Sequence, residues 1–362
     1  MKVLKVGGSC LAGPRDYAGL AARARAEGAR VLVVSALQGV TDALVALVAG
    51  QAGAPTSAEL GRRHLALLEG TDAEARASAA TSLATLAEEL ETRLRGLVPG
   101  TADPWEVDAV LGLGERMSLV VARAHVPGPV RAHVAEEAGV LTTAEPGAAR
   151  VLERGATLVR DRLGGHTEGL DLVAGYVGRS EDGRWTTLGR GGSDVTAAFL
   201  AWALGGDAVL LKDTPGLLSA DPRLVPAARL LPALDPAHAL ILARSGAQIV
   251  APAALELCQR HGLTLRVRPW RGEGPGTVIG AGQGTSARAL AVGPAPGDAA
   301  AALLTWVGHG VETLASHGRD TLRGLGIKTL VHSPREAGVL RIQVPASSAL
   351  EAARALHSLW AA

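Results

Sequence analysis

TTLGRGGSDVTAAFLAWALGGDAVLLKDTPGLLSADPR, residues 186–223, contains a glycine-rich turn, a helical segment and a buried strand in direct succession. The turn at 189–192 holds three glycines, whose missing Cβ atoms let backbone amides approach a ligand closely. Ser193 and Asp194 follow as N-cap candidates for a helix that runs to about Leu204. A helix start offers unpaired N–H groups and the positive end of the helix dipole, so this turn suits a phosphate group.

The strand after this helix also ends in polar residues. Ala208–Leu211 is an apolar run, typical of a buried parallel strand, and Lys212 and Asp213 follow it directly. Open α/β sheets bind their ligands at the carboxyl ends of strands. Together with Arg190, Ser193 and Asp194, these residues favour a nucleotide or phosphate site over a simple connection.

The composition narrows the class of protein. The 362 residues suit two domains, and 48% of them are hydrophobic, enough for a sizeable core. A net charge of +1 and only nine aromatic residues (six Trp, two Tyr, one Phe) give no case for a nucleic-acid partner or an anionic membrane surface. Two distant cysteines, no signal peptide and no apolar run long enough to span a membrane predict a cytoplasmic protein.

The N-terminal part predicts a parallel sheet. Lys2–Val6 reads as a strand, Asp16–Glu27 as a helix and Arg30–Val34 as a second strand, which is a βαβ unit. Lys5 precedes Gly7 and Gly8, so its ammonium group could reach a phosphate lying over that turn.

Further helices and strands are expected along the rest of the chain. The segments predicted as helices are two within 57–97, then 107–121 (interrupted at 112–114), 150–162, 235–244 and 252–261; those predicted as strands are 171–177, 263–267 and 276–279, with a hairpin turn at 178–184. A linker at 283–286 then leads into a small α+β unit of the ferredoxin-like kind, with strands at 289–292, 328–332 and 339–344 and helices at 298–307 and 348–360.

Six short motifs resemble those of the aspartate kinases, members of the amino-acid kinase family. They are KVGGS at 5–9, VVSAL at 33–37, GERMS at 114–118, TLGRGGSD at 187–194, SADPR at 219–223 and PGT at 275–277, in the order expected of that family. The resemblance covers about residues 1–280. It implies an open, mostly parallel sheet between helices over residues 1–282, followed by a divergent, single ACT-like module at 285–362 that serves regulation or dimerisation.

The resemblance also implies an activity: phosphoryl transfer from ATP, with Mg²⁺, to the β-carboxylate of L-aspartate. By position, the resemblance implies that Lys5 contacts the transferred phosphate and that Asp194 orients the lysines. It places Ser35, Thr41, Glu115, Arg190 and Ser193 on the aspartate side, with Glu115 on the amino group and Arg190 on a carboxylate. It places Gly7, Gly8, Ser9, Lys212, Asp213, Arg223 and Gln248 along the nucleotide.

Two positions depart from the family pattern. The family usually has a lysine at the position of Gln248, and threonine at the position of Lys212. We hypothesise that Lys212 supplies the positive charge that Gln248 lacks.

Other interpretations remain open from the sequence. One is a kinase of the same fold that acts on another amino acid or small carboxylate, and another is a sensor that binds nucleotide or amino acid without turnover. The histidines show no ligand-like spacing, so we expect no structural metal. Family membership implies a homodimer.

Overall fold

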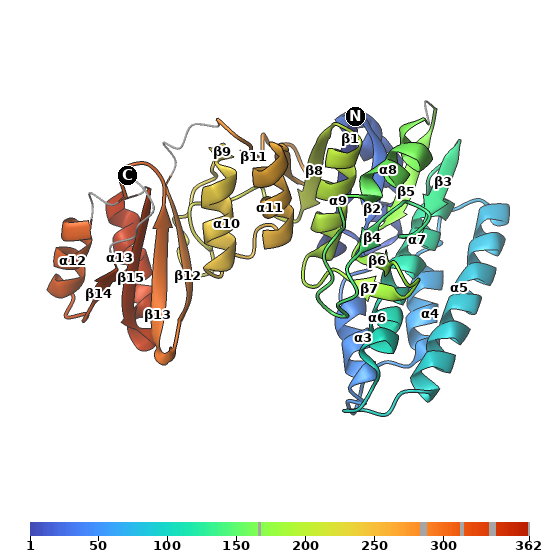
Figure 1. Ribbon diagram of the computed structural model, residues 1–362, viewed down its shortest axis with the longest axis horizontal. Helices are drawn as coiled ribbons and strands as arrows, with labels where there is room; N and C mark the ends of the chain where they lie inside the picture. The colour runs from blue at the N-terminus through green and yellow to red at the C-terminus, as the bar shows by residue number, and fades with distance from the viewer. Residues whose placement is uncertain (166–167, 283–287, 312–314, 333–337, 361–362) are drawn as a thin grey trace. The chain divides into compact units, whose positions relative to one another are not determined.

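The computed structural model describes residues 1–165, 168–282, 288–311, 315–332 and 338–360. The chain forms two compact units, Met1–Asp213 and Thr214–Ala362, and each is described by itself (Figure 1). The linker expected at 283–286 lies outside the described residues. The division into a catalytic domain of 1–282 and a module of 285–362 therefore stays a prediction.

The main sheet of the first unit is parallel, as the sequence predicts. Its strands lie in the order β3-β5-β2-β1-β8. Their bounds are β1 (Lys2–Val6), β2 (Ala29–Val34), β3 (Val130–His133), β5 (Leu170–Ala174) and β8 (Asp207–Lys212). The three valines and one leucine of 31–34 are fully buried, because a parallel sheet is covered on both faces. The strand predicted at 171–177 ends at Ala174, since Tyr176 has a φ of 69° that an extended strand cannot continue.

Helices make up most of the rest of this unit (Figure 1). Their bounds are α1 (Pro14–Ala18), α2 (Leu20–Glu27), α3 (Val40–Val48), α4 (Ser57–Ala66), α5 (Ala73–Arg95), α6 (Pro104–Leu111), α7 (Leu113–His125), α8 (Gly155–Val159) and α9 (Gly192–Ala203). The helical pair expected within 57–97 is confirmed as α4 and α5. Thr56 and Asp72 cap their N-termini by accepting backbone N–H groups. The interruption expected at 112–114 is the junction of α6 and α7 at Gly112.

The helix predicted at 150–162 starts later than expected. Val151 forms an antiparallel bridge with Thr142, which holds this stretch extended, and α8 begins only at Gly155. A second, small sheet in the first unit comprises β4 (Leu141–Thr142), β6 (Val177–Ser180) and β7 (Trp185–Thr187). β6 and β7 are antiparallel, which confirms the predicted hairpin.

The start of α9 differs from the expected cap. Neither Ser193 nor Asp194 is the N-cap; that position belongs to Gly191, whose φ of 75° is left-handed. The helix begins at Gly192, so Ser193 and Asp194 lie inside its first turn and Asp194 is the third helical residue. A carboxylate there is still stabilised by the helix dipole.

The second unit is described in two parts. Its first part holds β9 (Ala233–Leu234), α10 (Pro236–Arg244), α11 (Pro252–His261), β10 (Leu265–Pro269) and β11 (Thr277–Ile279). β10 pairs antiparallel with β11, and β11 pairs parallel with β9. The predicted helices and strands of this part are confirmed.

The C-terminal part of the second unit is a four-stranded antiparallel sheet in the order β12-β13-β15-β14. Its elements are β12 (Ala289–Ala295), β13 (Asp298–Val307), α12 (Ala315–Gly324), β14 (Leu330–His332), β15 (Val339–Pro345) and α13 (Ala349–Trp360). The helix predicted at 298–307 is wrong: this segment is the strand β13. Its run of alanines and leucines favours a helix locally, but β13 pairs with a strand on each side and buries Leu304 and Trp306 in the core, so tertiary pairing overrides propensity.

Candidate active site

Two lysines lie on the same face of the parallel sheet. Lys5 of β1 stands opposite Leu210 of β8, and Lys212 follows Leu210 by two residues. Because side chains alternate between the two faces of a strand, Lys5, Leu210 and Lys212 share one face. The chain contains only four lysines, and two of them lie at the carboxyl ends of neighbouring strands.

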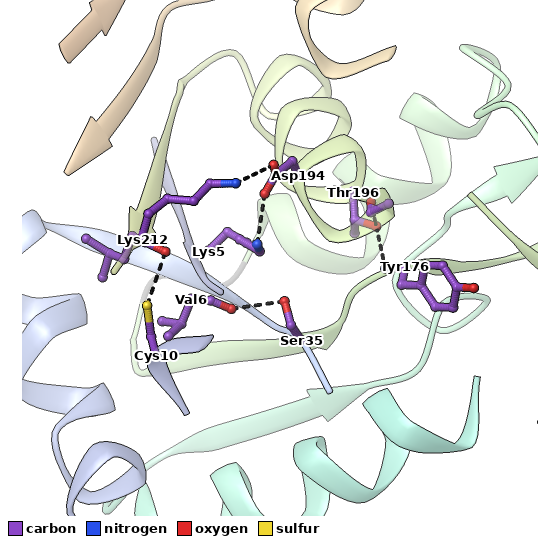
Figure 2. A network of polar contacts seen from close by, with 10 residues as sticks. Lys5, Val6, Cys10, Ser35, Tyr176, Asp194, Thr196 and Lys212 are labelled. Atoms are coloured by element: carbon purple, nitrogen blue, oxygen red, sulfur yellow. Dashed lines mark hydrogen bonds and ion pairs between the residues drawn. The ribbon is translucent and has the colours of Figure 1, made fainter. Parts of the chain in front are cut away.

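Asp194 connects these two lysines (Figure 2). The Nζ of Lys5 lies 2.8 Å from Oδ1 of Asp194, and the Nζ of Lys212 lies 2.8 Å from Oδ2. The side chains of Asp194 and Lys5 are 2% and 8% exposed, whereas that of Lys212 is 22% exposed. Helix α9, which carries Asp194, packs against both strands, so one buried carboxylate fixes two ammonium groups at one place.

The ionisation of this cluster follows from its geometry. Burial raises the pKa of Asp194, but the ammonium groups of Lys212 and Lys5 outweigh burial and hold that pKa well below its usual range. Burial lowers the pKa of Lys5, and Asp194 opposes this effect. With Asp194 ionised between two ammonium groups, the cluster has a net charge of +1 and attracts an anion.

The ends of the strands β1, β2 and β8 are held together at this site. The N–H of Gly7 donates to the carbonyl of Leu211 (3.1 Å), and the hydroxyl of Ser35 donates to the carbonyl of Val6 (3.0 Å). Gly8 lies so close to the segment after β2 that a Cβ there would be 2.7 Å from the carbonyl oxygen of Ala36. The predicted residues Gly7, Gly8 and Ser35 therefore lie at the carboxyl ends of these strands, beside Lys5.

Glu115 lies deep in the first unit, in the first turn of α7. Its side chain is 3% exposed, and within the described residues its Oε2 has no hydrogen-bond partner. Burial raises the pKa of Glu115 to about 8, against the lowering effects of the backbone N–H of Ala36 and the charge of Lys5. A buried carboxyl with one open oxygen is suited to bind a cationic group.

Tyr176 is a residue of this region that the sequence analysis missed. Its φ of 69° is unusual for a residue with a Cβ. The structure holds it from two sides. Its N–H donates to Thr196 of α9 (3.2 Å; Figure 2), and its carbonyl accepts the N–H of Leu188 (2.9 Å). Burial raises the pKa of its phenol to about 12, so the phenol stays neutral at physiological pH. No pattern in a single sequence indicates such a φ at a tyrosine.

The other predicted site residues of the first unit differ in exposure. Arg190 is exposed on the glycine-rich turn, Ser193 is buried in the first turn of α9, and Thr41 is half-buried in the first turn of α3. Ser9 and Asp213 are exposed, each close in sequence to a lysine of the cluster.

Two predicted nucleotide residues belong to the second unit. Arg223 is exposed and forms an ion pair with Asp221. Gln248 is exposed in the turn before α11. Their predicted roles, like those of the other site residues, stay predictions.

Neither a protein-built metal centre nor a membrane span is found in the part of the chain that the structure describes. No group of three or more His, Cys, Asp or Glu side chains there is arranged to hold a metal ion. None of the described helices combines the length and apolarity needed to cross a membrane.

Comparison with known protein families shows to which family the chain belongs. Residues 1–269 match the sequence model of the amino acid kinase family. This chain belongs to the amino acid kinase family. The matched residues contain all the predicted site residues, including Lys5, Glu115, Asp194 and Lys212.

Two curated relatives of this amino acid kinase are aspartokinases. This chain is 36% identical to the aspartokinase of Mycolicibacterium smegmatis over 182 residues. The aligned segment is 49% of this chain and 42% of that protein. The chain is 34% identical to the aspartokinase of Thermus thermophilus over 179 residues. That aligned segment is 48% of this chain and 44% of that protein. The aligned segments thus span less than half the length of these relatives.

Solved structures agree on the fold along nearly the whole chain. Escherichia coli aspartokinase III, in complex with aspartate and ADP, superposes with a TM-score of 0.85 at 21% identity and covers 99% of both chains. The aspartate kinase of Clostridium acetobutylicum superposes with a TM-score of 0.74 at 14% identity and covers 99% of this chain and all of that one. The chain therefore has the fold of these kinases, including the C-terminal part.

Proposed function

We propose that this protein is an aspartate kinase, which transfers the γ-phosphoryl group of ATP to the β-carboxylate of L-aspartate. The observation that carries the proposal is the Lys5–Asp194–Lys212 cluster at the carboxyl ends of β1 and β8. Identities of 34–36% with aspartokinases over about half of the chain support the choice of substrate. So does the fold shared with an aspartokinase that binds aspartate and ADP.

The lysine cluster suits a transferred phosphoryl group. Phosphoryl transfer requires positioning and neutralisation of charge rather than a covalent intermediate. The two ammonium groups supply the charge, and Asp194 fixes their separation before ATP arrives. Lys212, the more exposed of the two, supplies in this proposal the charge that Gln248 lacks.

The acceptor is held by three groups of the first unit. Glu115 binds the ammonium group of aspartate through its open oxygen, and the exposed Arg190 binds a carboxylate, which a guanidinium group can do with two parallel hydrogen bonds. Ser193 contributes a hydroxyl next to Asp194. These roles rest on the motifs of the family and on the burial of each side chain.

The reaction then needs no catalytic proton transfer. An oxygen of the β-carboxylate attacks the γ-phosphorus, the bond from that phosphorus to the β,γ-bridging oxygen breaks, and ADP leaves with the electron pair. The products are 4-phospho-L-aspartate and ADP. Mg²⁺ enters with ATP as part of the substrate and neutralises phosphate oxygens.

Three further properties belong to the same proposal. The protein works in the cytoplasm, it forms a homodimer, and the C-terminal sheet with α12 and α13 is an ACT-like module with a regulatory or dimerising role. The four-stranded sheet with helices is the observation that supports the last of these.

Formation of a hydroxamate tests the activity. Purified protein is incubated with Mg-ATP, hydroxylamine and L-aspartate, with glutamate, N-acetylglutamate and other small carboxylates in parallel. Hydroxylamine traps an acyl phosphate, so we expect a signal with L-aspartate. A signal with another acid alone would refute aspartate as the substrate. Binding of ATP without a signal from any acid would favour a sensor without turnover.

A further inference from the structure

One buried carboxylate of the first unit lies outside the lysine cluster and forms no ion pair with the residues that the structure describes. Asp108, on α6, is 1% exposed. Its Oδ2 accepts the N–H groups of Gly147 (2.9 Å) and Thr187 (2.7 Å), and its Oδ1 accepts the hydroxyl of Thr187 (2.8 Å). A buried carboxylate held only by neutral donors is costly, so its hydrogen bonds call for an explanation.

Both partners of Asp108 lie beside the glycine-rich turn. Thr187 is the last residue of β7 and stands three residues before Arg190. Gly147 lies against the turn, because a Cβ on Gly189 would be 3.4 Å from the carbonyl oxygen of Gly147. Asp108 therefore joins helix α6 to the two backbone segments that flank Arg190.

Further backbone contacts lead from this junction into the turn. The carbonyl of Thr187 accepts the N–H of Ala149 (3.0 Å), and the N–H of Leu188 donates to the left-handed Tyr176 (2.9 Å). The N–H of Gly192 then closes the turn onto the carbonyl of Gly189 (2.9 Å). The side chain of Arg190 is exposed, so the position of its guanidinium group depends on the backbone that carries it.

We propose that Asp108 is a positioning residue, which fixes the turn at 188–191 so that Arg190 meets the carboxylate of the acceptor substrate. The inference rests on the proposed function. Asp108 touches neither substrate, and its effect passes through Thr187 and Gly147. It therefore governs the affinity for the acceptor more than the affinity for ATP.

Replacement of Asp108 separates this role from a general structural one. Asp108→Ala removes all three hydrogen bonds. Because a clamp on a non-reacting carboxylate acts on ground state and transition state alike, we expect the KM for aspartate to rise roughly tenfold or more, with kcat and the KM for ATP changing less than about threefold. Asp108→Asn can keep all three bonds, since its oxygen can accept both N–H groups while its amide donates to the Thr187 hydroxyl. This variant is expected to restore the wild-type KM.

Thr142→Val is the matched control. It removes a buried hydroxyl–hydroxyl bond of 2.6 Å to Thr186, the residue before Thr187, without touching the turn. We expect it to lower the stability and to leave the KM for aspartate unchanged. If Asp108→Ala does not fold, Thr187→Val removes a single bond of the same junction and should raise that KM roughly threefold.

The outcomes of these experiments distinguish a failure of the proposed function from a failure of the positioning role of Asp108. A wild-type protein without activity on aspartate refutes the proposed function itself. With an active wild type, an unchanged KM for aspartate in Asp108→Ala or, where that variant does not fold, in Thr187→Val would overturn the role of Asp108. An equal rise in Thr142→Val would also overturn it.

Discussion

At the scale of single residues, the most informative contacts are the two ion pairs that Asp194 forms with Lys5 and Lys212. Two lysines that share one buried carboxylate would repel each other without it, so Asp194 stabilises the protein and prepares the site at the same time. The sequence motif alone could name Lys5 and Asp194. It could not show that Lys212 reaches the same carboxylate, because that depends on the register between β1 and β8.

Lys212→Met tests whether the second ammonium group takes part in transfer. It removes one of two positive charges while keeping most of the side-chain length. Removing one preorganised charge from a transferred phosphoryl group typically lowers kcat by roughly 10²–10³-fold, which is the loss that we expect. The control is Lys2→Met at the exposed start of β1, which should leave kcat unchanged. An undiminished kcat in Lys212→Met would show that Lys212 does not replace the missing lysine at position 248.

Glu115 predicts a dependence of stability on pH. Its pKa rises from 4.5 to about 8 in the folded protein, so between these values the folded state binds a proton that the unfolded chain releases. The resulting stability is fully present below pH 4.5 and is lost as the pH rises through about 8. Glu115→Gln removes this titration. Because each pKa unit corresponds to about 1.4 kcal/mol, we expect this variant to exceed the wild type by on the order of a few kcal/mol at pH 9.

Urea unfolding at pH 6 and pH 9 measures the effect of Glu115. Glu88→Gln, at an exposed position of α5, is the control and should keep the wild-type pH dependence. A Glu115→Gln protein whose stability falls between pH 6 and pH 9 as steeply as that of the wild type would contradict the assignment.

At the scale of elements, the turn after β1 shows how closely the strand ends approach each other. Gly8→Ala would place a Cβ 2.7 Å from the backbone oxygen of Ala36, which cannot move away cheaply. We expect a loss of about 1–3 kcal/mol in the free energy of unfolding and a marked loss of activity, because Lys5 lies on the same strand. Gly13→Ala is the control, since no atom lies within 4 Å of its added Cβ. Equal stability of the two variants in urea unfolding would refute this packing argument.

The strand β13 gives a second prediction at this scale. Trp306 is fully buried in a core that also contains Ala220 and Val225 of the segment after β8. Trp306→Ala should cost about 3–5 kcal/mol and make the segment around 217–230 more sensitive to protease, because that segment packs on the same core. Mass spectrometry of the early cleavage products measures this. Leu359→Ala, at a 43% exposed position of α13, should leave the cleavage pattern unchanged, and an unchanged pattern in Trp306→Ala would contradict the prediction.

At the scale of the whole molecule, the sequence predicted the class of fold and most elements correctly. Apolar strands followed by polar turns gave the parallel sheet, since burial on both faces leaves a recognisable pattern in sequences such as 31–34 and 208–211. The prediction from the sequence was wrong at 298–307. The alanine-rich composition of this segment favours a helix, and only its pairing with β12 and β15 makes it a strand.

The residues of the candidate active site were predictable to a smaller extent than the fold. Motifs pointed to Lys5, Glu115 and Asp194, whose residue types suit phosphate and a substrate amine. Asp108 and Tyr176 were missed, because one acts through hydrogen bonds to distant backbone and the other through an unusual φ. Neither property leaves a pattern in a single sequence.

The most direct test of the central claim identifies the carboxylate that receives the phosphoryl group. Protein, Mg-ATP and L-aspartate are incubated, the acyl phosphate is reduced with borohydride, and the amino-acid product is identified by mass spectrometry and chromatography against standards. Transfer to the β-carboxylate predicts homoserine, dependent on ATP and absent with Lys5→Met. No reduced product from the wild type, or the isomer that arises from the α-carboxylate, would contradict the account.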